Sequence, residues 1–100
     1  MPNKFILEPN APNPFNPETT IKFRLPVASR VSLKVYNILG QEVTTLIDRS
    51  LDGGFHQAVW NGLNKYNQSV ASGIYIYRLT AVSADGKDKF TQTRKMILLK

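Results

Sequence analysis

The sequence predicts an all-β fold, an immunoglobulin-like antiparallel β-sandwich of six to seven strands. Segments in which polar and apolar residues alternate follow one another along the chain, and clusters of turn residues separate them about every ten residues. No segment of useful length has the helical periodicity of an amphipathic helix. The 100 residues of the chain are the usual size of one domain with a single core.

The first predicted strand covers 20–25, where apolar residues alternate with polar ones, and Pro26 ends it because proline cannot donate to a ladder. A second strand with the same alternation covers 31–36. The stretch NILG at 37–40 then supplies an Asn and Gly40 for a tight turn, where positive φ is needed. Each of the two strands has one face for the core and one for water.

Two further strands are predicted on either side of a turn. Residues 42–47, EVTTLI, form the third strand, and the turn residues of DRSLDGG at 48–54 close it. Residues 55–60, FHQAVW, form the fourth strand. Its alternation places Trp60 on the face that points inward.

The second half of the chain contains a loop, the strongest strand signal and a hairpin. Residues 61–73 are rich in Asn, Ser and Gly and are interpreted as a loop. The stretch IYIYRLTAV at 74–82 is apolar or aromatic on both faces, which predicts a central strand covered on two sides. The Asp-Gly pair within 83–87 predicts a hairpin, and a last strand follows at 88–100.

The composition excludes several classes of protein. No apolar run approaches the ~18 residues of a membrane span, and the start of the chain lacks a secretory signal, so export needs a signal elsewhere in a longer chain. The 13 Lys and Arg and 7 Asp and Glu give a net charge of +6, but the basic residues are scattered and no nucleic-acid motif accompanies them. The absence of cysteine excludes a disulfide framework. We therefore expect no membrane span and no nucleic-acid partner.

Few residues are available for catalysis or metal binding. His56 is the sole histidine, and a lone histidine beside an inward face is usually packed and hydrogen-bonded. Asp48 and Asp52 bracket a turn, but two carboxylates fall short of the six to eight oxygens that calcium takes. We expect that the protein is not an enzyme and has no catalytic residue, no cofactor and no metal site.

Carbohydrate binding stays open as an alternative, because aromatic side chains of small β-sandwiches often stack on sugar rings. Two tyrosines share one face of the predicted central strand and are expected at the core or its rim, with hydroxyls reaching solvent. The asparagines of the loop recur at a three-residue spacing and are interpreted as Asx turns, although the sequence leaves a loop-bound calcium ion or glycan open. The tyrosine candidates are Tyr36, Tyr66, Tyr75 and Tyr77, and the asparagines are Asn61, Asn64 and Asn67.

Five stretches carry a family resemblance: PNPFNPETTIKFRLP, VSLKVYNILGQEVTTL, GGFHQAVWNG, VASGIYIYRL and RKMILLK. In this order they resemble the type A C-terminal sorting domain of cargo proteins of the type IX secretion system, from about Pro9 to Lys100. The layout is also similar to the related Ig-like domain of the flagellar hook-capping protein, but the two ends of the chain favour the sorting family. The residues that carry the structural motif are Pro12, Asn13, Pro14, Phe15, Gly40, Trp60, Gly73 and Tyr75.

The resemblance implies that residues 1–10 are a linker remnant and residues 11–100 a C-terminal sorting domain. Such a domain directs its cargo from the periplasm through the outer-membrane translocon to the cell surface or the exterior. A sortase-like surface protease then removes it and joins the cargo to anionic lipopolysaccharide. The alternative is a structural Ig-like module of an extracellular or flagellar assembly.

The last strand is the candidate for partner recognition. Its apolar residues occupy both faces, and at a sheet edge half of them would be exposed, which invites β-augmentation or a groove on a translocon component. Alternatively, one alternating pair completes the core, and both roles can hold, one for each face. An exposed edge also allows self-association. The candidate residues are Arg94, Lys95, Met96, Ile97, Leu98, Leu99 and Lys100.

The prolines of 11–17 predict a rigid segment outside the sheet, because proline removes backbone donors and favours extended geometry before it. Phe15 is the one aromatic anchor of this segment and is expected to cap an end of the core. A surface protease would then reach the chain ahead of Pro12, the sandwich would follow Pro17, and the prolines would keep the two apart.

Overall fold

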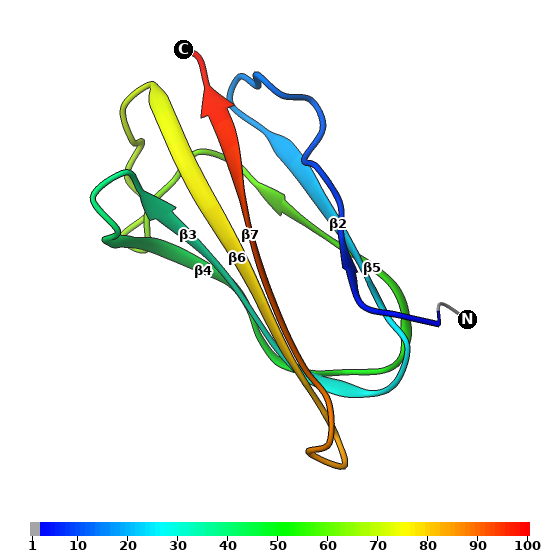
Figure 1. The fold of residues 1–100 in the computed structure, drawn as a ribbon. Coiled ribbons are helices and arrows are strands. Elements are labelled where there is room, and N and C mark those ends of the chain that lie inside the picture. The colour runs from blue at the N-terminus through cyan, green and yellow to red at the C-terminus, as the bar shows by residue number, and fades with distance from the viewer. Residues whose placement is uncertain (1–2) are drawn as a thin grey trace.

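The computed structural model describes residues 3–100, and in these residues it contains strands and no helix. The predicted all-β sandwich is confirmed, with seven strands and antiparallel pairing throughout both sheets (Figure 1). In chain order the strands are β1 (Ile6–Leu7), β2 (Thr19–Leu25), β3 (Ser29–Asn37), β4 (Glu42–Leu51), β5 (Gly54–Trp60), β6 (Gly73–Ser83) and β7 (Lys89–Leu98).

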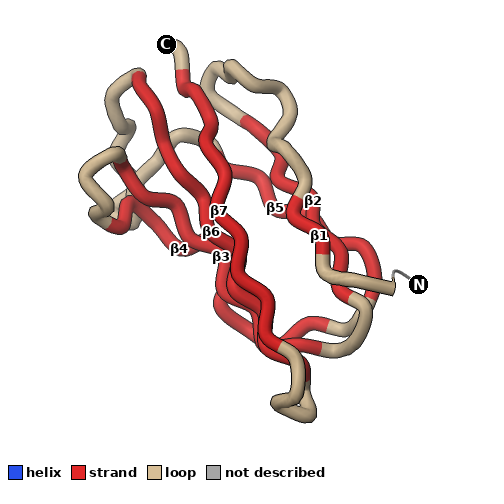
Figure 2. Tube along the Cα trace, viewed as in Figure 1, coloured by secondary structure: helices blue, strands red, loops and turns tan. Residues whose placement is uncertain are grey.

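The strands form two layers (Figure 2). One sheet has the order β1-β2-β5, and the other has the order β4-β3-β6-β7. β6 pairs with β3 and β7, as predicted for a central strand. Its outer face, however, is not covered as predicted: Ile74 is 48% exposed, because each sheet of a two-layer sandwich keeps one face toward solvent.

The core lies between the layers and consists of alternate residues of the strands. Trp60 is 1% exposed, so its predicted inward orientation is confirmed. Fully burying one large apolar side chain contributes ~1.5–3 kcal/mol to folding. The other buried apolar residues are Leu7, Phe15, Ile21, Phe23, Leu25, Val31, Leu33, Val35, Val43, Tyr75, Tyr77, Leu79, Ala81, Met96 and Leu98.

The strand expected at 42–47 is longer than predicted. β4 continues to Leu51, which pairs with Ser29, although the stretch after residue 47 contains residues typical of turns. Residues 48–51 pair with 29–32 in continuous register, and the two register shifts of the β3–β4 ladder lie earlier in β4, within 42–47. Pairing with a full-length neighbour therefore overrides the local turn propensity.

The beginning of the chain differs from the linker expected over residues 1–10. Residues 1–2 lie outside the described residues, but Ile6 pairs with Arg24 and Leu7 with Phe23. Leu7 is fully buried in the core. A free linker would leave this side chain in water, so the sandwich begins before Pro9.

No helix in the described part of the chain is long and apolar enough to cross a membrane.

The short turns follow the predicted chemistry. Gly40 has φ +82°, as a turn with positive φ requires. Asn37 was also expected to supply positive φ. It stabilises the turn through its side chain instead, whose oxygen accepts hydrogen bonds from the backbone N–H groups of Leu39 and Gln41. The predicted Asp-Gly hairpin joins β6 to β7, and Gly86 has φ +76°. Glycine tolerates such left-handed backbone without the steric cost of a Cβ atom.

Candidate functional site

The two segments that the sequence singled out at its ends meet at one end of the sandwich. Figure 1 shows the C-terminus beside the segment that precedes β2 and the start of β6. We define the N-terminal strap as residues 5–17, which include β1 and the proline-rich segment. The strap runs from the side of the three-stranded sheet to the end of β7.

β7 is an edge strand of the four-stranded sheet and presents two different faces. Met96 and Leu98 are fully buried, whereas Ile97 is 38% exposed and Leu99, just beyond the strand, is 52% exposed. One alternating pair therefore completes the core. The other pair places apolar side chains in solvent.

The strap covers the backbone edge of these last residues. The backbone N–H of Phe15 donates to the carbonyl of Ile97 at 3.0 Å, and the N–H of Leu99 donates to the carbonyl of Phe15 at 2.9 Å. The N–H of Ile97 donates to Asn13 Oδ1 at 3.0 Å. β-Augmentation at 97–99, which the sequence suggested, would therefore require displacement of the strap. At 97–99, the exposed side chains rather than the backbone edge are therefore what the strand offers to a partner.

The strap is attached along its length. The segment 11–17 lies outside the ladders except for two isolated bridges, Ala11 with Thr20 and Phe15 with Leu98. Residues 6 and 7, which lie ahead of Pro12, are paired in the sheet. The protease boundary ahead of Pro12 stays a prediction.

An aromatic cluster holds the proline-rich segment on the core. Phe15 is 2% exposed and meets the Trp60 ring edge-on at 5.7 Å between centroids. The Trp60 ring meets Tyr75 in the same way at 5.1 Å. The indole N–H of Trp60 donates to the carbonyl of Leu63 at 2.9 Å, which satisfies its one polar atom. The expected position of Phe15 at an end of the core is confirmed by this burial.

The tyrosine hydroxyls of β6 do not reach solvent as expected. The Tyr75 hydroxyl donates to the carbonyl of Ala71 at 2.7 Å, and the Tyr77 hydroxyl donates to the carbonyl of Glu8 at 2.9 Å. Burial raises the pKa of both tyrosines. Neither ring is a platform for a sugar, because the side chains of Tyr75 and Tyr77 are 7% and 0% exposed.

Two glycines with positive φ lie beside the cluster. Gly73 begins β6 with φ +154° and pairs with Leu98, so it brings the start of β6 to the end of β7. Gly62 has φ +77°, and a Cβ at this position would lie 3.4 Å from the carbonyl oxygen of Pro17. The sequence analysis missed Gly62, although its place directly after the Trp-Asn pair is a local signal for a turn.

The predicted cations have three different environments. Arg94 is half-buried, and its Nε donates to the carbonyl of Leu7 at 2.8 Å, so it fastens the strap. Lys100 Nζ donates to Ser69 Oγ at 2.8 Å. Lys95 is exposed on the outer face of the sheet. Lys95 is thus the cation of the set that lies nearest in register to the exposed Ile97.

A buried polar pair that joins the strap to β2 was also missed. Asn10 Nδ2 donates to Thr19 Oγ1 at 2.9 Å, and Thr19 Oγ1 donates to the carbonyl of Pro12 at 2.8 Å. Asn10 and Thr19 are 4% and 1% exposed. These bonds close the bend between the strap and β2. No local sequence pattern identifies them, because Asn10 lies in the stretch interpreted as linker.

Two of the three loop asparagines, Asn61 and Asn64, form the Asx turns that were predicted. The side-chain oxygen of Asn61 accepts the N–H of Leu63, and that of Asn64 accepts the N–H groups of Tyr66 and Gln68. Asn67 has φ 60° and no such side-chain bond is found for it among the described residues. The described residues contain no cluster of three or more acidic, His or Cys side chains that could hold a metal ion.

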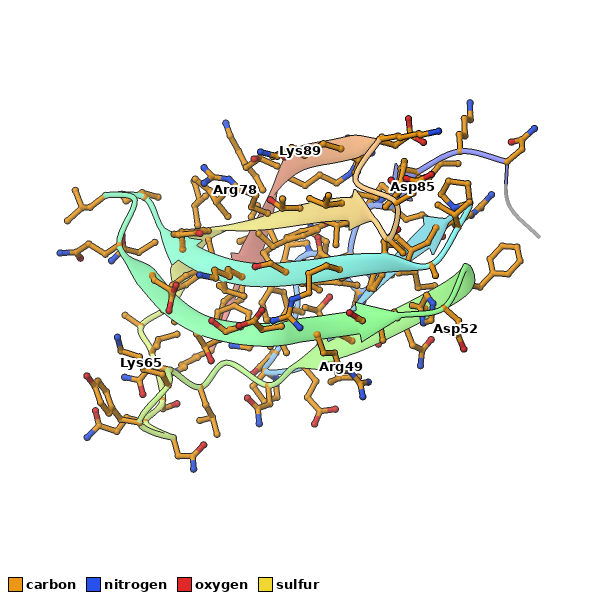
Figure 3. All side chains as sticks on the ribbon, turned by 90° about the horizontal axis from the view of Figure 1, so that it is seen from below. Arg49, Asp52, Lys65, Arg78, Asp85 and Lys89 are labelled. Atoms are coloured by element: carbon orange, nitrogen blue, oxygen red, sulfur yellow. The ribbon has the colours of Figure 1, made fainter. Side chains whose placement is uncertain are left out.

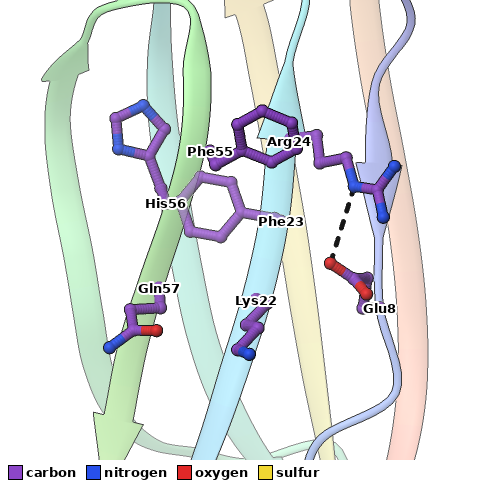
Figure 4. Close-up of a pocket in the computed structure, with 7 residues that line it drawn as sticks. All are labelled: Glu8, Lys22, Phe23, Arg24, Phe55, His56 and Gln57. Atoms are coloured by element: carbon purple, nitrogen blue, oxygen red, sulfur yellow. Dashed lines mark ion pairs between the residues drawn. The ribbon is translucent and has the colours of Figure 1, made fainter. Parts of the chain in front are cut away.

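A second surface lies on the outer side of the three-stranded sheet. This surface contains a groove of about 520 Å³. Figure 4 shows its lining side chains and the ion pair between Arg24 and Glu8, in which Arg24 Nε lies 3.6 Å from the carboxylate. His56 stacks on Phe23, and its Nε2 lies 2.7 Å from the carbonyl of Asp52, so the packed, hydrogen-bonded histidine is confirmed. The described lining contains no Ser, Thr or Cys that a base could activate.

Comparisons with known proteins agree with this architecture. A family model described as FlgD Ig-like domain matches residues 11–85. No curated protein matches the chain.

Three solved structures share the fold. Dimeric latent PorU from Porphyromonas gingivalis is 20% identical with a TM-score of 0.75, over 99% of this chain and 10% of that chain. PorZ, described as an essential bacterial surface component of the type-IX secretion system of Porphyromonas gingivalis, is 17% identical with a TM-score of 0.55, over 94% of this chain and 11% of that chain. FlgD from P. aeruginosa is 17% identical with a TM-score of 0.63, over 95% of this chain and 74% of that chain. The present chain therefore spans about a tenth of the PorU and PorZ chains.

Proposed function

Since the chain belongs to the FlgD Ig-like domain family, we propose that it is a non-catalytic Ig-like module whose specific task is to sort a secreted cargo protein through the outer-membrane type IX translocon. On this proposal, the domain crosses the periplasm with its cargo and ends at the cell surface or outside the cell. Its partners are translocon components and a sortase-like surface protease, and the cargo is attached to anionic lipopolysaccharide.

The observation that carries the proposal is that the last residues are alternately buried in the core and exposed to solvent. Met96 and Leu98 anchor the strand in the core, while Ile97 and Leu99 remain exposed beside Lys95. An apolar pair on a rigid strand, next to a cation, is a surface that a receptor can recognise without refolding the domain. The five matching stretches, and the fold shared with a type IX component such as PorZ, support the type IX context.

The test fuses the domain to a reporter in a bacterium with a type IX system. Removing residues 96–100 would also remove two core side chains, so a double substitution of the exposed pair, Ile97→Ser with Leu99→Ser, is the sharper variant. We expect export of the reporter to fall at least about tenfold, which corresponds to losing ~1.4 kcal/mol of recognition, while thermal unfolding of the purified domain changes little.

The matched control is Val27→Ser with Val59→Ser, because these side chains are 45% and 51% exposed and lie away from the last strand. The control should be exported like the unchanged domain. Export of the Ile97 and Leu99 variant at the level of this control would contradict the sorting role.

A structural module in a flagellar or other extracellular assembly is a second candidate. The family match and the overlap with 74% of the FlgD chain favour it. The two candidates differ in the position of the domain. A precursor in which the module lies in mid-chain, with substantial sequence following Lys100, would favour the assembly role over sorting.

A further inference from the structure

A groove of about 460 Å³ opens between the β3–β4 turn and the loop at 61–72. The backbone N–H of Lys65 donates to the carbonyl of Val43 at 2.9 Å, so the loop is held against β4. Figure 3 shows Lys65 at the end of the molecule opposite Asp52 and Asp85. The volume is within the range of small-molecule sites. The lining residues are Asn37, Gln41, Glu42, Val43, Asn64, Lys65, Tyr66, Val70 and Tyr75.

The groove has an apolar floor and one aromatic wall in solvent. Val43 and Tyr75 are buried, and Val70 is half-buried beside them. Tyr66 is 71% exposed, and Lys65 Nζ lies 5.5 Å from the centre of its ring. An exposed ring next to a shallow groove offers its face to the C–H side of a flat, partly apolar ligand such as a pyranose.

The hydrogen bonds around the groove fix the orientation of its amides. Asn64 accepts two backbone N–H groups, so the atom that they contact is its oxygen. Asn37 likewise accepts two backbone N–H groups, and its NH₂ therefore donates to Gln41, whose contacting atom is the oxygen Oε1. The side-chain oxygens of Asn64 and Gln41 are thus occupied. The NH₂ groups of both residues are pure donors that line the groove, and no hydrogen bond from either is found among the described residues.

The charged side chains of the groove also favour a ligand that accepts hydrogen bonds. Lys65 adds an ammonium group to the two amide donors. Glu42 is the one acidic side chain in the lining, and its carboxylate is paired with Lys34 at 3.1 Å. The ion pair raises the pKa of Lys34 through a hydrogen bond and the charge of Glu42. The unpaired polar atoms of the groove are therefore mostly donors, and their complement is a ligand rich in acceptors.

We propose that this groove binds a pyranose unit that carries a carboxylate, as in an acidic polysaccharide. The sugar ring would stack on Tyr66, its carboxylate would contact Lys65, and its ring and hydroxyl oxygens would accept from Asn64 and Gln41. Hydrogen bonds to a charged group are stronger than neutral ones, which favours an acidic over a neutral sugar. The inference is independent of the sorting role, which rests on the last strand.

The test is a titration of the domain with tetragalacturonate, followed by the NMR signals of the side-chain NH₂ groups. We expect saturable shifts at Asn64 and Gln41, and binding of cellotetraose, a neutral sugar of the same length, at least about tenfold weaker. Tyr66→Ala should remove measurable binding. Asn64→Asp keeps the oxygen that accepts the two backbone N–H groups but replaces the donor by a negative charge, so we expect binding about tenfold weaker or more.

The matched control is Asn61→Asp, in the same loop but outside the groove, which should bind like the unchanged domain. Three results would overturn the inference. The first is the absence of any shift of the Asn64 and Gln41 side-chain amide signals at about 10 mM sugar, because this would mean an affinity weaker than millimolar. The second is equal binding of the neutral tetrasaccharide. The third is an equal effect of the Asn61 and Asn64 substitutions on binding.

Discussion

The N-terminal strap and the turn between β6 and β7 are both irregular, but they are held in different ways. The strap is fastened by residues far along the chain, such as Tyr77, which donates to the carbonyl of Glu8. The turn is fastened largely by its own residues: Asp85 Oδ1 accepts from Ser83 Oγ at 2.6 Å and from the N–H of Lys87 at 3.0 Å. One further bond leaves the turn, from the N–H of Ala84 to the carbonyl of Ala28 at 2.9 Å. A change in the strap should therefore affect the whole domain, whereas a change in the turn should stay local.

The attachments of the strap explain why it belongs to the domain. β1 extends the three-stranded sheet, while Phe15 is bonded to the last residues of the four-stranded sheet. The strap thus connects the two layers along one side of the sandwich. It also links the start of the domain to the strand that we propose as the recognition element.

The largest effect is expected from Phe15→Ala. The ring is 2% exposed and contacts Trp60, and truncation of a buried Phe typically costs about 3–5 kcal/mol of stability. Urea unfolding should show this loss, and limited proteolysis should reach the strap within 5–17. The control Phe55→Ala removes a ring that is 70% exposed and should change stability by about 0.5 kcal/mol or less. Equal results for the two variants would mean that the strap is not anchored by Phe15.

A smaller effect is expected from Tyr77→Phe. The ring stays in the core, but the carbonyl of Glu8 loses its hydroxyl donor, which should cost about 1–2 kcal/mol of unfolding free energy. Tyr66→Phe is the matched control, because its side chain is 71% exposed. In a double variant with Phe15→Ala, the two losses should not add, since both residues hold the same strap. Strict additivity would argue that the strap is not one cooperative unit.

The strands and the short turns could be predicted because their signals are local. Alternation along 20–25 and 31–36 is enough to identify β2 and β3 and their inward faces. The turns at Gly40 and Gly86 follow from residues that tolerate positive φ or accept nearby N–H groups. The end of β4 was missed because its pairing with β3 is a tertiary effect that local residues do not encode.

The candidate site could be predicted only in part. Phe15 and Trp60 stand out as large aromatic residues next to prolines and glycines, and the structure brings them together. The bonds from Arg94 to Leu7 and from Tyr77 to Glu8 involve backbone carbonyls, which carry no sequence signature. The part of the strap up to residue 10 was therefore interpreted as a linker. Its attachment depends on hydrogen-bond donors far along the chain, which reach its backbone carbonyls only in the folded sandwich.

The smallest effect is expected from Asp85→Asn, at the turn that is held locally. The hydroxyl of Ser83 and the N–H of Lys87 lower the pKa of Asp85 from its ordinary value of 3.8. A carboxylate with a lowered pKa in the folded state stabilises the protein above its unfolded pKa and loses this contribution as the pH falls through the folded pKa. The stability difference between the unchanged domain and the variant should therefore be constant near neutral pH and shrink below about pH 4. Urea unfolding at a series of pH values measures this, and a difference that grows with acid would contradict it. Because the bonds of the Asp85 side chain lie within this turn, the variant should also leave the protease resistance of the strap unchanged.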